Sequence, residues 1–185
     1  MNRNTALINI DIQQAFYHPK WGERNNPEAE ENASRLLKRW REKDWKVIHI
    51  QHQSDKPESL FHPDHEGFAI KEIVAPIAGE KMITKKVNSS FIGTDLEAYL
   101  HKNGISRVVF TGLTTPHCVS TTTRMSGNLG FDTYLVSDAT AAFGLTDQAG
   151  TYHDPETIHR LSLATLHDEF ATILTTDELL NLIEA

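Results

Sequence analysis

The sequence predicts an α/β protein, a single doubly wound three-layer α/β/α domain on a mostly parallel sheet of about six strands. Two observations lead to this fold. Short runs of β-branched and aliphatic residues alternate with helix-like stretches along all 185 residues, a pattern typical of parallel sheets with helices on both faces. No linker-like tract or repeat interrupts the chain, so residues 1–185 are expected to form one domain.

The six predicted strands are short apolar runs bounded by polar or turn-forming residues. They cover residues 6–10, 47–50, 82–84, 107–111, 133–136 and 171–174. Each run is too short for a buried helix, and β-branched residues are frequent in them, which favours strands.

Capping residues mark the predicted helices. Asn26 is expected to cap a helix that starts at Pro27, and Asp154 a helix that runs to about Asp168. A further helix is expected to start within residues 112–119. The other signals are two capping boxes and two helix-ending glycines, namely Thr94–Glu97, Thr175–Glu178, Gly104 and Gly130. Residues 53–69 and 140–153 look irregular, and long loops of this kind often close over substrates.

Composition argues against several classes of partner. The chain has 18 Lys and Arg against 25 Asp and Glu, a net charge of −7, and no basic patch, so nucleic acid and anionic membranes are poor candidates. Cys118 is the only cysteine, which excludes an intrachain disulfide. No apolar run approaches the roughly 18 residues of a membrane span, and the first residues do not read as a signal peptide. We expect a soluble, acidic, cytoplasmic domain.

Three chemically useful side chains follow three predicted strands. Asp11 ends the first strand, the pair Lys85 and Lys86 follows the third, and Cys118 follows the fourth. Ligands of doubly wound sheets bind at the carboxyl ends of the strands. A carboxylate, a cation and a thiol are therefore expected to meet at one edge.

Cys118 is the most informative of these residues. Its position predicts a thiol in the first turn of a helix, where the helix dipole and free N–H groups favour the thiolate and can bind an oxyanion. A buried structural cysteine fits the position equally well. Likewise, Asp11 alone fits a turn residue and Lys85 a solvated surface charge. Only the combination favours catalysis.

These residues resemble the motifs of the isochorismatase-like cysteine hydrolases. Residues 6–13 followed by Phe16 resemble the first strand of that family with its aspartate, Thr84-Lys85 followed by residues 89–91 resembles its lysine segment, and residues 112–119 resemble its nucleophile loop. The resemblance implies a catalytic triad of Asp11, Lys85 and Cys118, with Lys85 favoured over Lys86 by its spacing from Ser89. It also implies a cis peptide between Leu113 and Thr114, and an oxyanion hole made by the N–H groups of Thr114 and Cys118.

The resemblance further implies the chemistry. Asp11 takes the thiol proton, Cys118 attacks the carbonyl of a small amide, ureide or carbamoyl compound, and water cleaves the resulting thioester. Nicotinamidases of this family carry a metal-binding run where this chain has His52, Ser54 and Glu58, so neither a metal nor another cofactor is expected. The remaining histidines are interpreted as ordinary polar or interface residues, namely His62, His65, His153, His159 and His167.

Loop residues near the triad are candidates for the substrate pocket. The candidates are Phe16, Trp21, His52, Leu60, Phe61, Phe91, Thr114 and His117, and the loops also contain His62, Phe68 and Phe143. At least half of the loop residues are expected to pack the lid and the core instead. The resemblance also implies a homodimer or homotetramer, with the helix that starts near Ser120 as an interface candidate.

Other functions remain open from the sequence. The same activated cysteine fits a redox-responsive or ligand-binding protein without turnover, although the chain has no resolving cysteine. An isochorismatase-type ether hydrolase and an inactive relative are further alternatives. Cys118 argues against the ether hydrolase, and the complete set of Asp11, Lys85 and Cys118 argues against the inactive relative.

Overall fold

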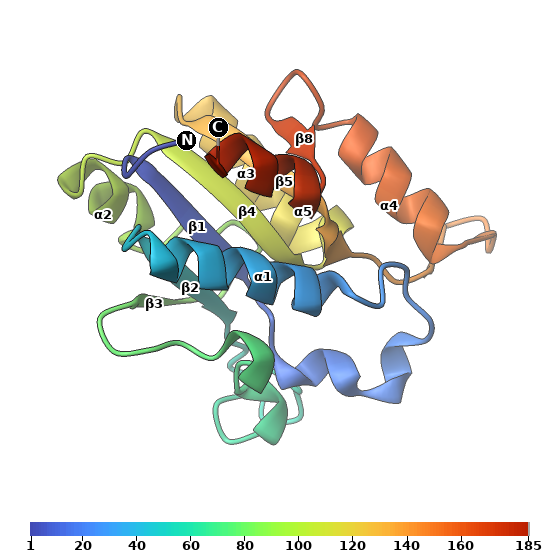
Figure 1. The fold of residues 1–185 in the computed structure, drawn as a ribbon. Helices are drawn as coiled ribbons and strands as arrows, with labels where there is room; N and C mark the ends of the chain where they lie inside the picture. The colour runs from blue at the N-terminus through green and yellow to red at the C-terminus, as the bar shows by residue number, and fades with distance from the viewer. Residues whose placement is uncertain (185) are drawn as a thin grey trace.

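The computed structural model describes residues 1–184 and contains a six-stranded parallel sheet (Figure 1). The strand order is β3-β2-β1-β4-β5-β8. The strands are β1 (Thr5–Ile10), β2 (Val47–His52), β3 (Lys81–Lys85), β4 (Arg107–Leu113), β5 (Asp132–Ala141) and β8 (Thr172–Leu174). The predicted α/β fold class is thereby confirmed.

The chain reverses its winding direction at β1. This strand pairs in parallel with β2 on one side and with β4 on the other. In doubly wound sheets such a switch point leaves a crevice at the carboxyl ends of the two central strands. Asp11, which follows β1, lies at this crevice.

Helices cover both faces of the sheet (Figure 1). On one face, α1 (Ala29–Glu42) and α5 (Thr176–Glu184) pack against alternate strand residues such as Leu7 and Val109. On the other face, α2 (Leu96–Lys102) and the segment of α3 (Ser120–Asn128) cover the intervening residues such as Ile8 and Phe110. Each strand therefore buries both sets of side chains, as expected for a parallel sheet.

Several strands continue past their predicted ends. β2 and β4 each extend by two residues, and β5 extends from Val136 to Ala141. The extension of β5 pairs with the end of β4 after a register shift, with Gly112 opposite Thr140. These added residues carry the sheet up to the crevice, where polar side chains replace the apolar pattern on which the prediction relied.

Two predicted helix boundaries are wrong. α1 begins at Ala29, two residues late, because Asn26 has φ of +43° and its side chain donates to the carbonyls of Ser137 and Thr140 on β5. α4 (Pro155–Ala164) starts as predicted, with Asp154 accepting from Thr157 N, but ends four residues before Asp168.

The predicted C-terminal capping box is present. Glu178 Oε2 accepts from Thr175 N at 2.8 Å, and Glu178 N donates back to Thr175 Oγ1 at 3.3 Å. The box predicted at residues 94–97 is incomplete, because Thr94 Oγ1 accepts from Leu96 N at 3.3 Å while Asp95 makes no side-chain cap.

Short elements occupy the stretches expected to be irregular. Residues 53–69 contain the 3₁₀ turn η3 (Glu66–Phe68), and residues 140–153 contain a hairpin of β6 (Leu145–Thr146) and β7 (Tyr152–His153). Three further 3₁₀ turns are η1 (Gln14–Tyr17), η2 (Pro19–Trp21) and η4 (Glu72–Val74). A π-helical turn, η5 (Thr115–Val119), joins β4 to α3.

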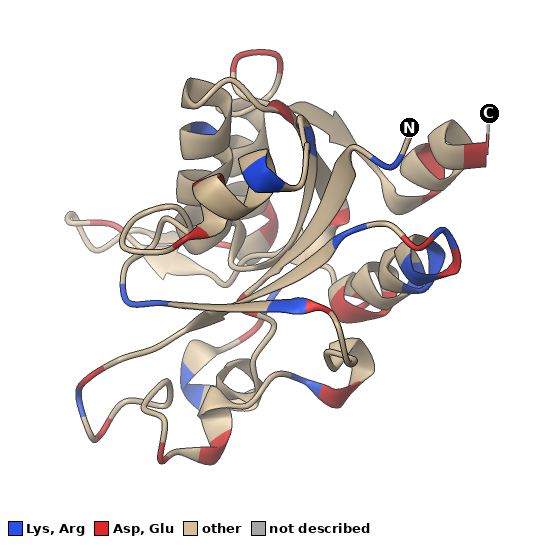
Figure 2. Ribbon diagram, turned by 90° about the vertical axis from the view of Figure 1, so that its left-hand side faces the viewer, with Lys and Arg blue, Asp and Glu red and all other residues tan. Residues whose placement is uncertain are grey.

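Charged residues of both signs are interspersed over the fold (Figure 2). Within residues 1–184, none of the helices has the length and apolar character that crossing a bilayer requires.

Candidate active site

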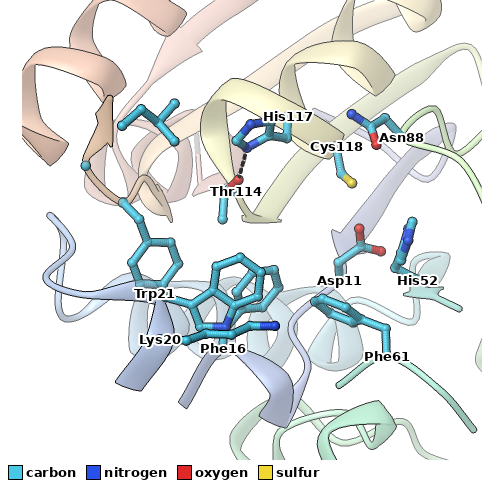
Figure 3. Close-up of a pocket in the computed structure, with 13 residues that line it drawn as sticks. Asp11, Phe16, Lys20, Trp21, His52, Phe61, Asn88, Thr114, His117 and Cys118 are labelled. Carbon is cyan, nitrogen blue, oxygen red and sulfur yellow. Dashed lines mark hydrogen bonds between the residues drawn. The ribbon is translucent and has the colours of Figure 1, made fainter. Parts of the chain in front are cut away.

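A cavity of about 380 Å³ opens at the carboxyl edge of the sheet (Figure 3). Its walls combine the predicted site with several loops. The lining residues are Asp11, Phe16, Lys20, Trp21, His52, Phe61, Asn88, Thr114, His117, Cys118, Phe143, Gly144 and Leu145. The wall is mainly apolar, and polar groups converge on one end of it.

Asp11 and Lys85 form a buried ion pair at that end. Lys85 Nζ donates to Asp11 Oδ2 at 2.7 Å, and the two side chains are 2% exposed or less. Asp11 follows β1 directly, with φ of +52°, and Lys85 is the last residue of β3. The pair therefore spans β2, and it depends on three neighbouring strands ending at the same level.

The Lys85 ammonium has two more acceptors. Its Nζ lies 3.1 Å from His52 Nδ1 and 3.2 Å from Cys118 Sγ. His52 is opposite Lys85 in the β2–β3 ladder. The neighbouring Lys86 is exposed and pairs with Asp55. Lys85, and not Lys86, thus contacts the thiol.

The surroundings of Cys118 keep its thiol protonated. Burial raises the pKa of Cys118 to about 12, the Asp11 carboxylate adds to the rise, and the Lys85 ammonium offsets only part of it. The thiolate that the helix start predicts for Cys118 is therefore not favoured, and this prediction is wrong. Desolvation of the thiolate exceeds the attraction of one cation that already neutralises Asp11.

Asp11 retains one free acceptor beside the thiol. Its Oδ1 is buried without a hydrogen-bond partner among the described residues. Carboxylate oxygens in low dielectric surroundings are costly to leave unpaired. An unpartnered oxygen in this position can accept a proton from Cys118 or from a bound molecule.

The turn that carries Cys118 is held by its own contacts. The peptide between Leu113 and Thr114 is cis, as expected. Gly112 before it has φ of +123°, and a Cβ there would lie 2.0 Å from the carbonyl oxygen of Ile10, so only glycine fits between β4 and β1. Thr114 Oγ1 lies 2.9 Å from His117 Nδ1 (Figure 3), which directs His117 to Thr114 and not to the thiol.

A buried histidine supports the same turn from α4. His159 is 4% exposed, and its Nδ1 lies 2.8 Å from Thr115 Oγ1. Its Nε2 lies 3.4 Å from Asn26 Nδ2, but both hydrogens of that amide go to the carbonyls of Ser137 and Thr140, so the hydrogen bond to Thr115 is the contact that ties His159 to the turn. Burial lowers the pKa of His159, consistent with a neutral ring. The sequence gives no signal for this role of His159, because its partners lie far away in the chain.

Six of the eight predicted pocket residues lie in the cavity wall: Phe16, Trp21, His52, Phe61, Thr114 and His117. Leu60 and Phe91 do not. Leu60 is buried beside a separate hollow, and Phe91 packs in the core, stacked on Phe131 with 6.0 Å between ring centroids. An apolar residue in a loop carries no signal that separates a pocket wall from the core.

The aromatic wall is one contiguous cluster. Phe16 lies between Trp21, Phe61 and Phe143, with ring centroids 5.3–6.0 Å apart. Phe143, considered among the loop residues, lines the cavity, whereas His62 and Phe68 do not. The lining residues that sequence reasoning missed are Lys20, Asn88, Gly144 and Leu145; no periodicity or motif distinguishes them.

The polar end of the cavity also offers three kinds of metal ligand. Asp11, His52 and Cys118 have ligand atoms within 4.8 Å of one another. The Lys85 ammonium contacts all three side chains and already supplies a positive charge between them. A metal ion bound there would have to displace this ammonium, so the donor set does not fit a resident metal well.

Comparison with known proteins assigns the family. The isochorismatase domain matches residues 5–178, and the chain belongs to the isochorismatase family. An uncharacterised member of this family from Bacillus subtilis, YrdC, is 71% identical over 181 residues, covering 98% of this chain and 97% of YrdC.

A solved structure of an isochorismatase-family protein from Chromobacterium violaceum is 40% identical, with a TM-score of 0.95 over 97% of this chain and 93% of that one. Nicotinamidase 3 of Arabidopsis thaliana is 32% identical over 111 residues, which are 60% of this chain and 50% of that protein. The protein is thus an isochorismatase-family hydrolase related to amidohydrolases.

Proposed function

We propose that the protein is a cysteine-dependent hydrolase that cleaves the C–N bond of a small amide, ureide or carbamoyl compound. The observation that carries this proposal is the position of Lys85 Nζ, 2.7 Å from Asp11 and 3.2 Å from Cys118, two residues that line the cavity. A nucleophile, a base and a fixed cation are the groups that covalent acyl transfer requires. The relation to a nicotinamidase supports the choice of an amide bond.

Asp11 is the base in this mechanism. Because the pKa of Cys118 is about 12, the thiol loses its proton during the attack and not before it. The proton moves to Asp11 Oδ1, the unpartnered oxygen, while Sγ forms a bond to the substrate carbonyl carbon. The N–H groups of Thr114 and Cys118 bind the developing oxyanion, and Lys85 stabilises negative charge on the cluster.

The same proton then completes acylation. Asp11 gives it to the departing nitrogen as the C–N bond breaks, which leaves a thioester on Cys118 and a neutral amine or ammonia. A water molecule next loses a proton to Asp11 and attacks the thioester. The carboxylic acid leaves, and the proton returns to the Cys118 sulfur.

The cavity limits the substrate class. A volume of about 380 Å³ suits a small molecule. The walls are formed mainly by aromatic rings, and Lys20 at the exposed rim is the one charged residue that lines the cavity besides Asp11. We propose a small compound with a planar or apolar portion that packs against Phe16, Trp21 and Phe143.

An ammonia-release assay over small primary amides, ureas and carbamoyl compounds tests the proposal. The wild type is expected to release ammonia from at least one of them, and Cys118→Ala to lose this activity. Activity that survives in Cys118→Ala would contradict the cysteine mechanism. The redox alternative is less well supported, because the protonated thiol is a poor nucleophile towards oxidants and the chain has no second cysteine.

A further inference from the structure

The environment of His52 fixes which of its nitrogens carries the proton. An ammonium has only donors, so the contact of 3.1 Å between Lys85 Nζ and His52 Nδ1 requires Nδ1 to accept. The hydrogen of a neutral ring must then be on Nε2. Burial and the Lys85 charge both lower the pKa of His52, which favours the neutral ring.

The ring is also held firmly in place. Gln13, which is fully buried, accepts from His52 N at 2.8 Å and donates to His52 O at 3.0 Å. Phe61 packs edge-on against the imidazole, with 5.4 Å between centroids and an interplanar angle of 80°. Gln13 thus fixes the backbone of His52, Lys85 fixes its Nδ1, and Phe61 fixes one face of the ring.

The opposite edge of the ring is free. His52 lines the main cavity next to Asp11 and Cys118 (Figure 3). Within residues 1–184, Nε2 has no hydrogen-bond partner, and it is not among the unpartnered side-chain atoms that are sealed from solvent. A fixed N–H without a partner, at the polar end of a mainly apolar cavity, is a selective group for a ligand acceptor.

We propose that His52 is a specificity-determining residue, whose Nε2–H, fixed by Lys85, donates to an uncharged acceptor atom of the substrate close to the scissile bond. The inference rests on the proposed hydrolase function. It narrows the substrate to compounds that carry such an acceptor, for example a ring nitrogen or a second carbonyl next to the reacting amide. A substrate with an N–H donor in that position would be disfavoured, because two donors would face each other.

Two substitutions test the two ring nitrogens of His52 separately. Asn places an oxygen near the position of Nδ1 and keeps an acceptor for Lys85, but it has no group at the position of Nε2. Gln places its amide near the position of Nε2 and keeps a donor to the cavity, but it loses the acceptor for Lys85. His52→Asn therefore tests the contact with the substrate, and His52→Gln is its matched control.

The first experiment reads the tautomer directly by long-range ¹H–¹⁵N NMR of histidine-labelled protein at pH 7, with His52→Asn for assignment. The proposal predicts a neutral His52 with its proton on Nε2. A proton on Nδ1, or a charged ring, would overturn it. This measurement does not depend on turnover. A failure of the His52 proposal can therefore be distinguished from a failure of the proposed hydrolase function.

The second experiment measures how well two probes protect Cys118 from iodoacetamide. The probes are acetanilide and N-(pyridin-2-yl)acetamide, which have the same shape and differ by one ring nitrogen beside the amide. The wild type is expected to bind the pyridyl compound about three- to tenfold more tightly, the range for one neutral hydrogen bond. His52→Asn is expected to lose this preference and His52→Gln to keep it. Equal binding by the wild type, or an unchanged preference in His52→Asn, would overturn the proposal.

Discussion

The Lys85 ammonium lies 2.7 Å from the Asp11 carboxylate, and both side chains are buried although they lie at the ends of two strands, β3 and β1, that are not neighbours. β2 lies between the two strands, and it contributes His52 to the same ammonium. Lys85 balances the charge of the Asp11 carboxylate through Oδ2 and leaves Oδ1 without a hydrogen-bond partner among the described residues. Asp11 therefore has a cation at one oxygen and an unpartnered acceptor at the other, which is the arrangement that the proposed mechanism needs.

Removal of the ammonium should destabilise the fold. Lys85→Met leaves the Asp11 carboxylate buried without its partner, which costs about 3–5 kcal/mol in comparable cases. Lys86→Met is the matched control, because Lys86 forms an exposed pair with Asp55 and should change stability by less than about 1 kcal/mol. Urea unfolding at pH 7 measures both free energies of unfolding. Similar small losses of stability in the two variants would contradict a contribution of the buried Lys85–Asp11 pair to the free energy of unfolding.

Cys118 should react slowly while the cavity is empty. With a pKa of about 12, its alkylation by iodoacetamide at neutral pH should be about a thousandfold slower than that of a free thiol with a pKa of ~8.5. Because the Asp11 charge raises this pKa, Asp11→Asn should speed alkylation while it abolishes hydrolysis. Since Cys118 is the only cysteine, the rate is unambiguous. Parallel changes of alkylation and hydrolysis in Asp11→Asn would contradict Asp11 as the base.

Glu30 should stabilise the fold in a pH-dependent way. Burial alone would raise its pKa, but hydrogen bonds and charges from Arg24 and Lys71 lower it to about 2. The folded-state pKa is thus below the unfolded value of ~4.3, so the stabilisation is present above about pH 4.5 and is lost as the pH falls towards 2. Glu30→Gln should cost about 2–3 kcal/mol at pH 7 and progressively less at lower pH.

The exposed neighbour Glu31 provides the control for this measurement. Glu31→Gln should change stability by less than about 0.5 kcal/mol at any pH. Urea unfolding between pH 2.5 and 7 follows both variants. A constant difference between wild type and Glu30→Gln across this range would show that Glu30 titrates normally.

His159 should couple α4 to the turn that carries Cys118. His159→Phe removes the hydrogen-bond partner of the buried Thr115 hydroxyl, which should cost about 1–3 kcal/mol. His159→Asn keeps a hydrogen-bonding group near the position of Nδ1 and should cost less. Because the folded-state pKa of His159 is lowered, its contribution is complete above the unfolded value of ~6.5 and is lost as the pH falls below it. The difference between wild type and His159→Phe should therefore shrink between pH 7 and 5, and a pH-independent difference would contradict a neutral His159.

The sequence predicts the fold and the position of the site because both follow from local patterns. Apolar runs separated by helices specify the parallel sheet, and strand ends such as Asp11 and Lys85 must then meet at one edge. The pKa of Cys118 could not be predicted this way. It depends on burial and on the charge of Asp11, and both come from residues that are distant from Cys118 in the chain.

The roles of two histidines also depend on long-range contacts. His52 meets Lys85 across a strand ladder, and His159 meets Thr115 from another helix. Neither contact leaves a periodicity in the sequence. The same holds for Leu60 and Phe91, which sit in pocket-like positions of the chain but pack elsewhere.

Acylation of Cys118 by p-nitrophenyl acetate tests the central claim most directly, because it needs no knowledge of the natural substrate. The wild type should release about one equivalent of nitrophenolate in a burst, since attack by the thiol precedes slower hydrolysis of the thioester. Acid quenching and peptide mass analysis should place the acetyl group on Cys118. Cys118→Ala should show no burst, and Asp11→Asn should slow it by about a hundredfold or more, in line with loss of a general base. A burst that persists in Cys118→Ala, or an acetyl group on another residue, would contradict Cys118 as the nucleophile.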